Sequence, residues 1–107
     1  MRIPPDALIA STKLTHYLLT PRVKDDKSKY LAQSGFDLAS ADRLETEIRR
    51  VAAERDGIID RVREHGTYYT VEGEIVGPLS VPLPVKLIWL HRTDGVFSFV
   101  TLVPQRK

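Results

Sequence analysis

The sequence predicts an α+β domain in which about three N-terminal helices pack on a four-stranded antiparallel sheet. In residues 1–56, apolar side chains recur with helical spacing and helix-capping residues precede them. In residues 57–103, apolar and polar residues alternate as in strands, with short turn sequences between the runs. Because the helices precede the strands instead of alternating with them, the sheet is expected to be antiparallel, with the helices on one face.

Three helices are expected in the first half of the chain. Pro21 ends the first because proline cannot continue a helix, and Gly35 stands where a C-terminal glycine belongs in the second. The third has the clearest apolar stripe, which consists of Leu44, Ile48, Val51 and Ala52. The helices are expected to run from Ser11 or Thr12 to Leu19, from Lys27 to Ser34, and from a cap at Asp37 or Ser40 to Gly57.

Four strands are expected after Gly57, where the period of the apolar residues changes to two. They comprise residues 58–64, 67–76, 85–90 and 96–103. His65-Gly66 is expected to join the first two strands, and Thr93-Asp94-Gly95 the last two. The proline-rich segment 77–84 is expected to be a loop or a frayed edge.

Length and composition indicate one domain that spans residues 1–107. The hydrophobic content of 42% is enough for a core, and the absence of cysteine excludes disulfides and thiolate sites. No metal or cofactor is expected, because metal-ligand spacing is missing among His16, His65 and His91. We expect no signal peptide, because the N-terminal residues lack a long apolar core, and the sequence contains no run of roughly 20 apolar residues. We therefore expect a soluble, cytoplasmic protein without a membrane partner.

A charged segment, Arg22–Tyr30, is the first candidate for chemistry. It places four cations, two acids and an aromatic ring beside a helix N-terminus, where backbone N–H groups favour phosphate. The alternative is a solvated loop whose aspartates cap the helix. Lys27 differs from the other cations because it shares a helical face with Tyr30 and Leu31, which draws it toward the core. The net charge of +2 gives only weak support for nucleic-acid binding.

Lys86 is the second candidate, because it interrupts an apolar strand and burying an unpaired charge is costly. The alternative is that its aliphatic stem covers apolar surface while the ammonium reaches water. Alternation directs Lys86 away from the face of Trp89 and His91. Trp89 is expected in the core, and His91 at the strand end is either merely exposed or an acid.

Two further positions in the sheet are candidates. Simple alternation places the Thr101 hydroxyl on the face of Phe97 and Phe99, where an ordinary sheet threonine is the alternative. Tyr68 and Tyr69 point to opposite faces, so one is expected to pack and the other to stack on a base or donate to a phosphate. We assign RNA binding to Tyr69.

These residues suit cleavage of RNA by its own 2′-OH. The sequence has no Ser/His/Asp signature, glycine-rich phosphate loop or paired-carboxylate motif, which argues against the corresponding hydrolases, kinases and glycosidases. Attack by the 2′-OH needs a base, an acid and cations, but no metal. We expect phosphate stabilisation or proton transfer by Lys27 and Lys86, phosphate positioning by Thr101, acid catalysis by His91, and RNA binding by Lys13, Lys24, Lys29 and Tyr69.

The same residues carry a family resemblance over nearly the whole chain, from about Ile3 to Pro104. The matching segments are Lys13–Pro21 (K-L-T-H-Y-L-L-T-P), Lys27–Leu31, Gly35-Phe36, Tyr69–Gly73, Lys86–Trp89 and Thr101. They resemble the pattern of a bacterial family, domain-of-unknown-function family 6883. The chain departs from this pattern at Arg22–Asp26, where many members carry a histidine and glycines. The resemblance implies a small stand-alone protein, or a domain at the end of a larger one, without an assigned activity.

Two functions from different classes remain. The order of helices and strands is similar to that of barnase and RelE-like toxins, which favours a metal-independent RNase of the toxin type with RNA as its partner. The alternative is a non-catalytic interaction module that pairs with a cognate antitoxin or immunity protein. A structural domain whose lysines only cover apolar surface is a third, weaker reading. The RNase hypothesis depends on Lys27 and Lys86 converging, and it loses its main support if they lie on opposite faces of the sheet.

Overall fold

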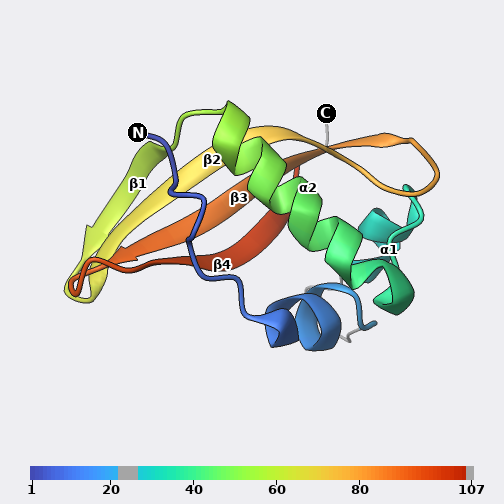
Figure 1. Ribbon diagram of the computed structural model, residues 1–107, viewed down its shortest axis with the longest axis horizontal. Helices are drawn as coiled ribbons and strands as arrows, with labels where there is room; N and C mark the ends of the chain where they lie inside the picture. Colours follow the sequence, from blue (N-terminus) through green and yellow to red (C-terminus); the bar gives the residue numbers. More distant parts are fainter. Residues whose placement is uncertain (22–26, 106–107) are drawn as a thin grey trace.

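The fold consists of one antiparallel sheet and one long helix. The computed structural model describes residues 1–21 and 27–105, and its four strands lie in the order β1–β2–β3–β4 (Figure 1). The strands are Ile58–Arg63 (β1), Gly66–Val76 (β2), Pro82–Arg92 (β3) and Phe97–Pro104 (β4). The expected α+β class and four-stranded antiparallel sheet are confirmed. In the part of the chain that the structure describes, no helix is long and apolar enough to cross a membrane.

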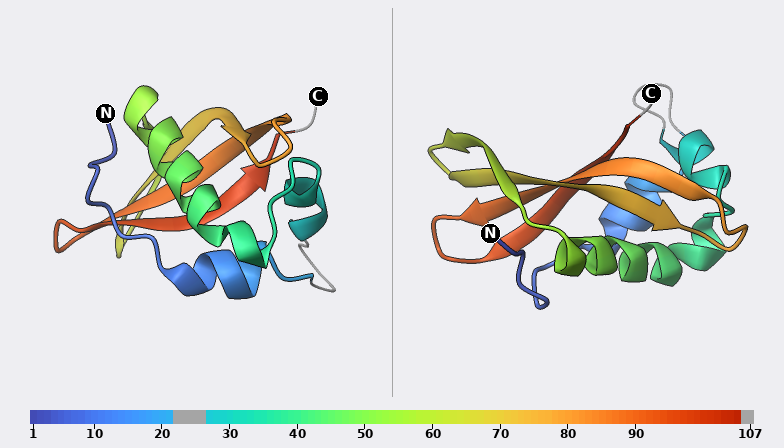
Figure 2. Two further views of the ribbon diagram at one scale, coloured as in Figure 1. Left: turned by 45° about the vertical axis from the view of Figure 1, so that its right-hand side comes forward. Right: turned by 90° about the horizontal axis from the view of Figure 1, so that it is seen from above.

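The helical half is less regular than the sequence suggests. Its segments are a π-helix at Lys13–Leu18, α1 at Ser28–Ala32, a 3-10 turn at Leu38–Ser40 and α2 at Ala41–Glu54. Only α2 lies along a face of the sheet, whereas α1 lies beyond one end of it (Figure 2). The expectation of three helices on one face is therefore corrected to one. The five-residue α1 is too short to cover a sheet: it ends at Ala32, and Gly35, where φ is +86°, follows three residues later.

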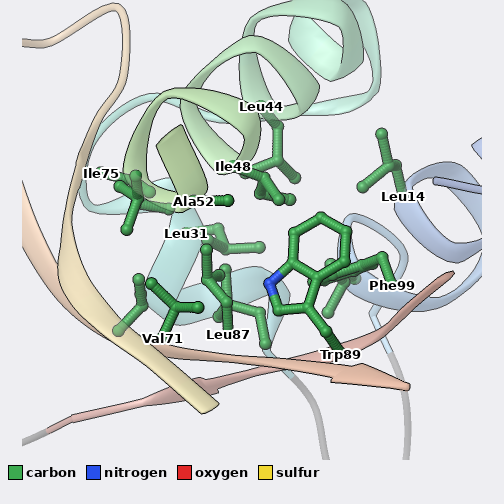
Figure 3. Close-up of a cluster of buried hydrophobic side chains, with 14 of the residues drawn as sticks. Leu14, Leu31, Leu44, Ile48, Ala52, Val71, Ile75, Leu87, Trp89 and Phe99 are labelled. Atoms are coloured by element: carbon green, nitrogen blue, oxygen red, sulfur yellow. The ribbon is translucent and has the colours of Figure 1, made fainter. Parts of the chain in front are cut away.

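Helix α2 covers the sheet through the apolar stripe expected for it. A capping box precedes the helix: Asp37 Oδ1 accepts from the Ser40 N–H at 3.1 Å, and Ser40 Oγ accepts from the Asp37 N–H at 2.9 Å. Figure 3 shows how the helix and sheet side chains meet in one core, which includes Leu44, Ile48, Ala52, Val71, Ile75, Leu87 and Trp89. The helix and β2 are so close that a Cβ on Gly73 would lie 2.7 Å from Val51.

Strand β3 begins within the proline-rich segment that was expected to be a loop. Pro82 and Pro84 already pair with β2, so the connection between the two strands is only Gly77–Val81. Prolines are tolerated in this stretch because β4 first pairs with β3 at Val85. Proline has no N–H group to donate, but Pro82 and Pro84 have no partner in β4, so no hydrogen bond between β3 and β4 is lost.

The two faces of the sheet differ in burial. The face that α2 covers is called the inner face, and along β3 its buried side chains are Val85, Leu87 and Trp89. The opposite face is called the outer face, and its half-buried side chains along β3 are Lys86, Ile88 and Leu90. As expected from alternation, Lys86 points away from Trp89.

A register shift in β4 changes the face on which Thr101 lies. Phe99 pairs with Trp89 on the inner face. Two residues later, Thr101 pairs with Ile88 on the outer face, because β4 contains an extra residue between these two pairs. Thr101 therefore does not share a face with Phe97 and Phe99, which corrects the expectation from simple alternation.

Candidate functional site

Lys27 and Thr101 meet at the outer face of the sheet. The Lys27 ammonium donates a hydrogen bond to Thr101 Oγ1 at 2.8 Å. Lys27 immediately precedes α1, and the buried Tyr30 anchors that helix through a hydrogen bond of 2.7 Å from its hydroxyl to the Pro84 carbonyl. The contact thus depends on two features: the anchoring of α1 and the bulge that turns Thr101 outward.

Tyr17 is the third member of this cluster, and sequence reasoning did not identify it as a site residue. Its hydroxyl accepts a hydrogen bond of 3.5 Å from the Lys27 ammonium, and its ring centroid lies 5.2 Å from that ammonium. The Lys13 ammonium lies 5.9 Å from the same centroid. Since an aromatic face attracts cations at these distances, Tyr17 interacts with both lysines. The only signal for it in the sequence was its place in the K-L-x-x-Y segment.

The segment that carries Tyr17 has an uncommon backbone. It is a π-helix, in which the Leu19 N–H donates to the Leu14 carbonyl five residues earlier at 2.9 Å. Buried Leu14 and Leu18 fasten this segment to the core. Short π-helical turns are rare and occur frequently at functional sites, so the backbone here is a second indication of function.

Lys86 lies on the same face as Thr101. It pairs with Val103 of β4, and the next residue on that face of β3, Ile88, pairs with Thr101. Diagonal neighbours in an antiparallel pair lie about 7–8 Å apart. Lys86 therefore borders the surface to which Thr101 binds Lys27, and the two lysines do not lie on opposite faces.

Among the residues that the structure describes, no carboxylate forms a salt bridge with these lysines. In residues 1–21 and 27–105, an arginine forms every salt bridge, and no salt bridge involves Lys13, Lys27, Lys29 or Lys86. Glu72 of β2 lies opposite Lys86, but its carboxylate accepts a hydrogen bond of 2.7 Å from the Gln105 side chain. Lys29 is exposed on α1, and Lys24 lies outside the described residues. The lysine cluster, as we call it below, consists of Lys13, Tyr17, Lys27, Lys86 and Thr101.

His91 and Tyr69 do not join the lysine cluster, because both lie on the inner face. The His91 ring stacks on Phe97 with ring centroids 4.1 Å apart and planes inclined by 7°. Tyr69 is 8% exposed, and its ring lies 6.0 Å from the same phenylalanine. Both side chains therefore contribute to packing near one end of the sheet.

Tyr68 is the tyrosine of this pair that faces outward. The Arg61 guanidinium lies 4.9 Å from its ring centroid, and its hydroxyl is 2.7 Å from His65 Nε2. As expected, the two tyrosines lie on opposite faces: Tyr69 packs in the core and Tyr68 faces outward.

No other part of the described structure offers a comparable site. A cavity of about 430 Å³ between the N-terminal segment and α2 is lined mainly by apolar groups, among them Ile3, Pro5 and Trp89. The arginines that line it are engaged in salt bridges: Arg2 with Asp56, Arg49 with Glu45, and Arg50 with Glu47 and Glu54. Within residues 1–21 and 27–105, no three His, Cys, Asp or Glu side chains are arranged to hold a metal ion. The lysine cluster is thus the place where an anion, such as a phosphodiester, fits best.

Comparisons with known proteins place this fold. A family model described as "Domain of unknown function (DUF6883)" matches residues 5–106. Among solved structures, a chain of the "Contact-dependent growth inhibition toxin - immunity protein complex from Klebsiella pneumoniae 342" has a similar fold, with a TM-score of 0.67 and 15% identity. The alignment covers 95% of this chain and 96% of that chain. No curated protein matches the sequence.

Proposed function

The chain belongs to the DUF6883 family, and we propose that it is a metal-independent RNase of the bacterial toxin type. The observation that carries this proposal is the 2.8 Å hydrogen bond between Lys27 and Thr101, because it brings Lys27 to the face on which Lys86 lies. Two ammonium groups and a hydroxyl then border one surface. Such a surface suits a phosphodiester and the extra negative charge that builds on it during cleavage.

In the proposed reaction, Lys27, Lys86 and Thr101 of the lysine cluster bind the phosphate at the bond to be cleaved. The 2′-oxygen attacks phosphorus as its proton passes to a solvent water molecule, and the bond from phosphorus to the 5′-oxygen breaks, which leaves a 2′,3′-cyclic phosphate. Lys27 and Lys86 stabilise the charge on the non-bridging oxygens, and one of them supplies the proton that the 5′-oxygen takes up. The Thr101 hydroxyl accepts from Lys27, and its own hydrogen, which donates to the Leu102 carbonyl over a long distance of 3.4 Å, can turn to a phosphate oxygen instead.

The remaining lysines extend the site along the RNA backbone. We assign contacts with neighbouring phosphates to Lys13, Lys24 and Lys29. We assign no role in the reaction to His91 or Tyr69, because their side chains pack on the inner face. The fold similarity to a chain of a toxin–immunity complex supports the toxin type and the existence of a cognate partner protein.

Cleavage of RNA by the purified protein in the presence of EDTA tests the proposal. A 5′-labelled unstructured RNA and a labelled hairpin RNA serve as substrates, and we expect fragments that end in 2′,3′-cyclic phosphate. Lys27→Met should lower the cleavage rate by at least about tenfold, since it removes both a charge and the bond to Thr101. Arg55→Met is the control, because Arg55 is an exposed cation at the end of α2 with no assigned contact to RNA, and it should retain most of the rate.

Two results would contradict the RNase proposal. One is that wild-type protein leaves both RNAs intact. The other is that Lys27→Met, with an unchanged circular dichroism spectrum, cleaves as fast as wild type. Substrates with 2′-deoxyribose throughout must also resist cleavage, because the proposed nucleophile is then missing.

The second candidate function is a non-catalytic module that binds a cognate protein. The toxin–immunity complex that contains the similar chain favours this alternative. It is tested by co-purification with the product of a neighbouring gene, using wild type and a double variant with Lys27→Met and Lys86→Met. A stoichiometric complex that survives the double change, together with no RNA cleavage by wild type, would support the module over the RNase.

A further inference from the structure

The two edges of the sheet are unequal. At the β4 edge, the Leu8 N–H donates to the Phe97 carbonyl at 2.9 Å, and the Leu8 carbonyl accepts from the Phe99 N–H at 2.7 Å. At the β1 edge, no described residue pairs with the outer side of the strand, which borders the sheet in Figure 1. A strand with unpaired N–H and C=O groups is a template for another strand.

Strand β1 also exposes aliphatic side chains on both of its faces. The exposed fractions are 68% for Ile58, 59% for Ile59 and 66% for Val62. A register shift at Asp60 keeps Ile59 and Val62 on the inner face, although they are three residues apart. The outer face of the strand carries Ile58, Arg61 and Arg63.

We propose that two copies of this chain associate by antiparallel pairing of β1 with β1, which joins their sheets into one. In a register centred between Asp60 and Arg61, the strand is complementary to itself. The opposed pairs are then Asp60 with Arg61, Ile59 with Val62, and Ile58 with Arg63. The apolar pair lies on the inner face and the Ile58–Arg63 pair on the outer face. In both of these pairs the opposed residues share a face, as antiparallel pairing requires.

Charge complementarity is the reason for choosing a second copy as the partner. Asp60 forms no salt bridge within residues 1–21 and 27–105, so its charge is available. A two-fold axis at the centre of the register generates two Asp60–Arg61 pairs, one on either side of it. A register shifted by one residue would instead place Arg61 opposite Arg61 of the other copy, which is destabilising.

Charge reversal tests this pairing directly. Sedimentation equilibrium over a concentration series should show a dimer for wild type. Asp60→Arg and Arg61→Asp should each raise the dimer dissociation constant by at least about tenfold, because each creates two pairs of like charge. An equimolar mixture of the two variants should restore the dimer, since each then supplies the charge that the other lacks.

A second pair of variants separates the strand edge from general surface effects. Val62→Lys should prevent dimer formation, whereas Leu38→Lys, at an aliphatic side chain 58% exposed in the 3-10 turn, should not. A monomeric wild type at every concentration, or a dimer that neither charge reversal weakens, overturns the proposal. Because these residues lie outside the lysine cluster, RNA cleavage by the monomeric variants tests the RNase proposal separately.

Discussion

The Lys27 ammonium lies 2.8 Å from Thr101 Oγ1, although 74 residues separate the two along the chain. A short helix positions the first residue, and a bulge in the last strand turns the second toward it. The contact itself lies at the outer face, away from the buried side chains of the inner face. Substitutions in this contact can therefore change the chemistry of the surface without emptying the core.

Thr101→Val removes the hydroxyl that accepts from Lys27 while nearly preserving the shape of the side chain. We expect the rate of RNA cleavage to fall about 10- to 100-fold, the effect of losing a hydrogen bond with a charged group. Thr70→Val is the matched control, because Thr70 pairs with Ile88 on the same face but forms no side-chain hydrogen bond in the described residues. If both variants lose activity equally, the contact with Lys27 is not the cause.

Lys86→Met should weaken RNA binding in a manner that depends on salt. If Lys86 contacts one phosphate, the slope of log Kd against log salt concentration should fall by about 0.7 for single-stranded RNA. Fluorescence anisotropy with a labelled oligonucleotide measures this slope. Arg92→Met serves as the control, because that guanidinium is bound to Asp94 at 2.7 Å, and an unchanged slope for Lys86→Met would remove Lys86 from the site.

Ser34→Ala should destabilise the fold by about 1–3 kcal/mol, because it leaves buried polar groups without a partner. Ser34 is fully buried; its hydroxyl donates to the Val81 carbonyl at 2.6 Å and accepts from the Gly77 N–H at 2.7 Å. Urea unfolding followed by the fluorescence of Trp89, which is the single tryptophan and is buried, measures the loss. Ser98→Ala, at a half-buried serine of β4 without such bonds, should change the stability by less than about 0.5 kcal/mol.

Glu47 makes the stability of the protein depend on pH. Bidentate hydrogen bonds from Arg50, at 2.8 and 3.0 Å, together with one from the Val76 N–H at 2.8 Å, hold the pKa of this carboxyl below its ordinary value of 4.5. The folded state thus favours the ionised form, so the stabilisation is complete above the unfolded pKa and is lost as pH falls through the folded pKa.

Glu47→Gln tests this dependence. At pH 7 the variant should be less stable than wild type by about 1–3 kcal/mol, and the difference in the free energy of unfolding should shrink below about pH 4. Glu45→Gln breaks a more exposed pair with Arg49 and should cost less than about 1 kcal/mol. A difference between wild type and Glu47→Gln that is constant from pH 7 to pH 3 would contradict the assignment.

The sheet and α2 were predictable because burial on one face leaves a periodic record in the sequence. Leu44, Ile48 and Val51 recur at helical spacing, and Val71 and Ile75 recur at even spacing, since each set faces the same core. The segment that became α1 was recognisable from its C-terminal glycine. The position of α1 away from the sheet was not predictable, because it depends on the length of the helix and not on the apolar pattern.

The lysine cluster was predictable only in part. Lys27 and Lys86 could be identified because their neighbours are apolar. The face on which Thr101 lies could not be predicted, because it depends on one extra residue in β4 that has no signature in the sequence. Tyr17 was missed because an α-helix and a π-helix with the same apolar anchors look alike in sequence. The sequence correctly placed His91 and Lys86 on opposite faces of the sheet. The stacking of His91 on Phe97 was not predictable, because it depends on the strand register.

The Leu8 bridge at β4 limits the size of any assembly built from this sheet. A sheet that is open on both sides adds units at each end and grows into a filament. Here Leu8 of the N-terminal segment already bonds to Phe97 and Phe99, so two chains joined at β1 would present at each border a β4 strand that is blocked at its start. Association would therefore stop at a dimer, because the irregular segment around Leu8 would prevent a further strand from pairing with β4.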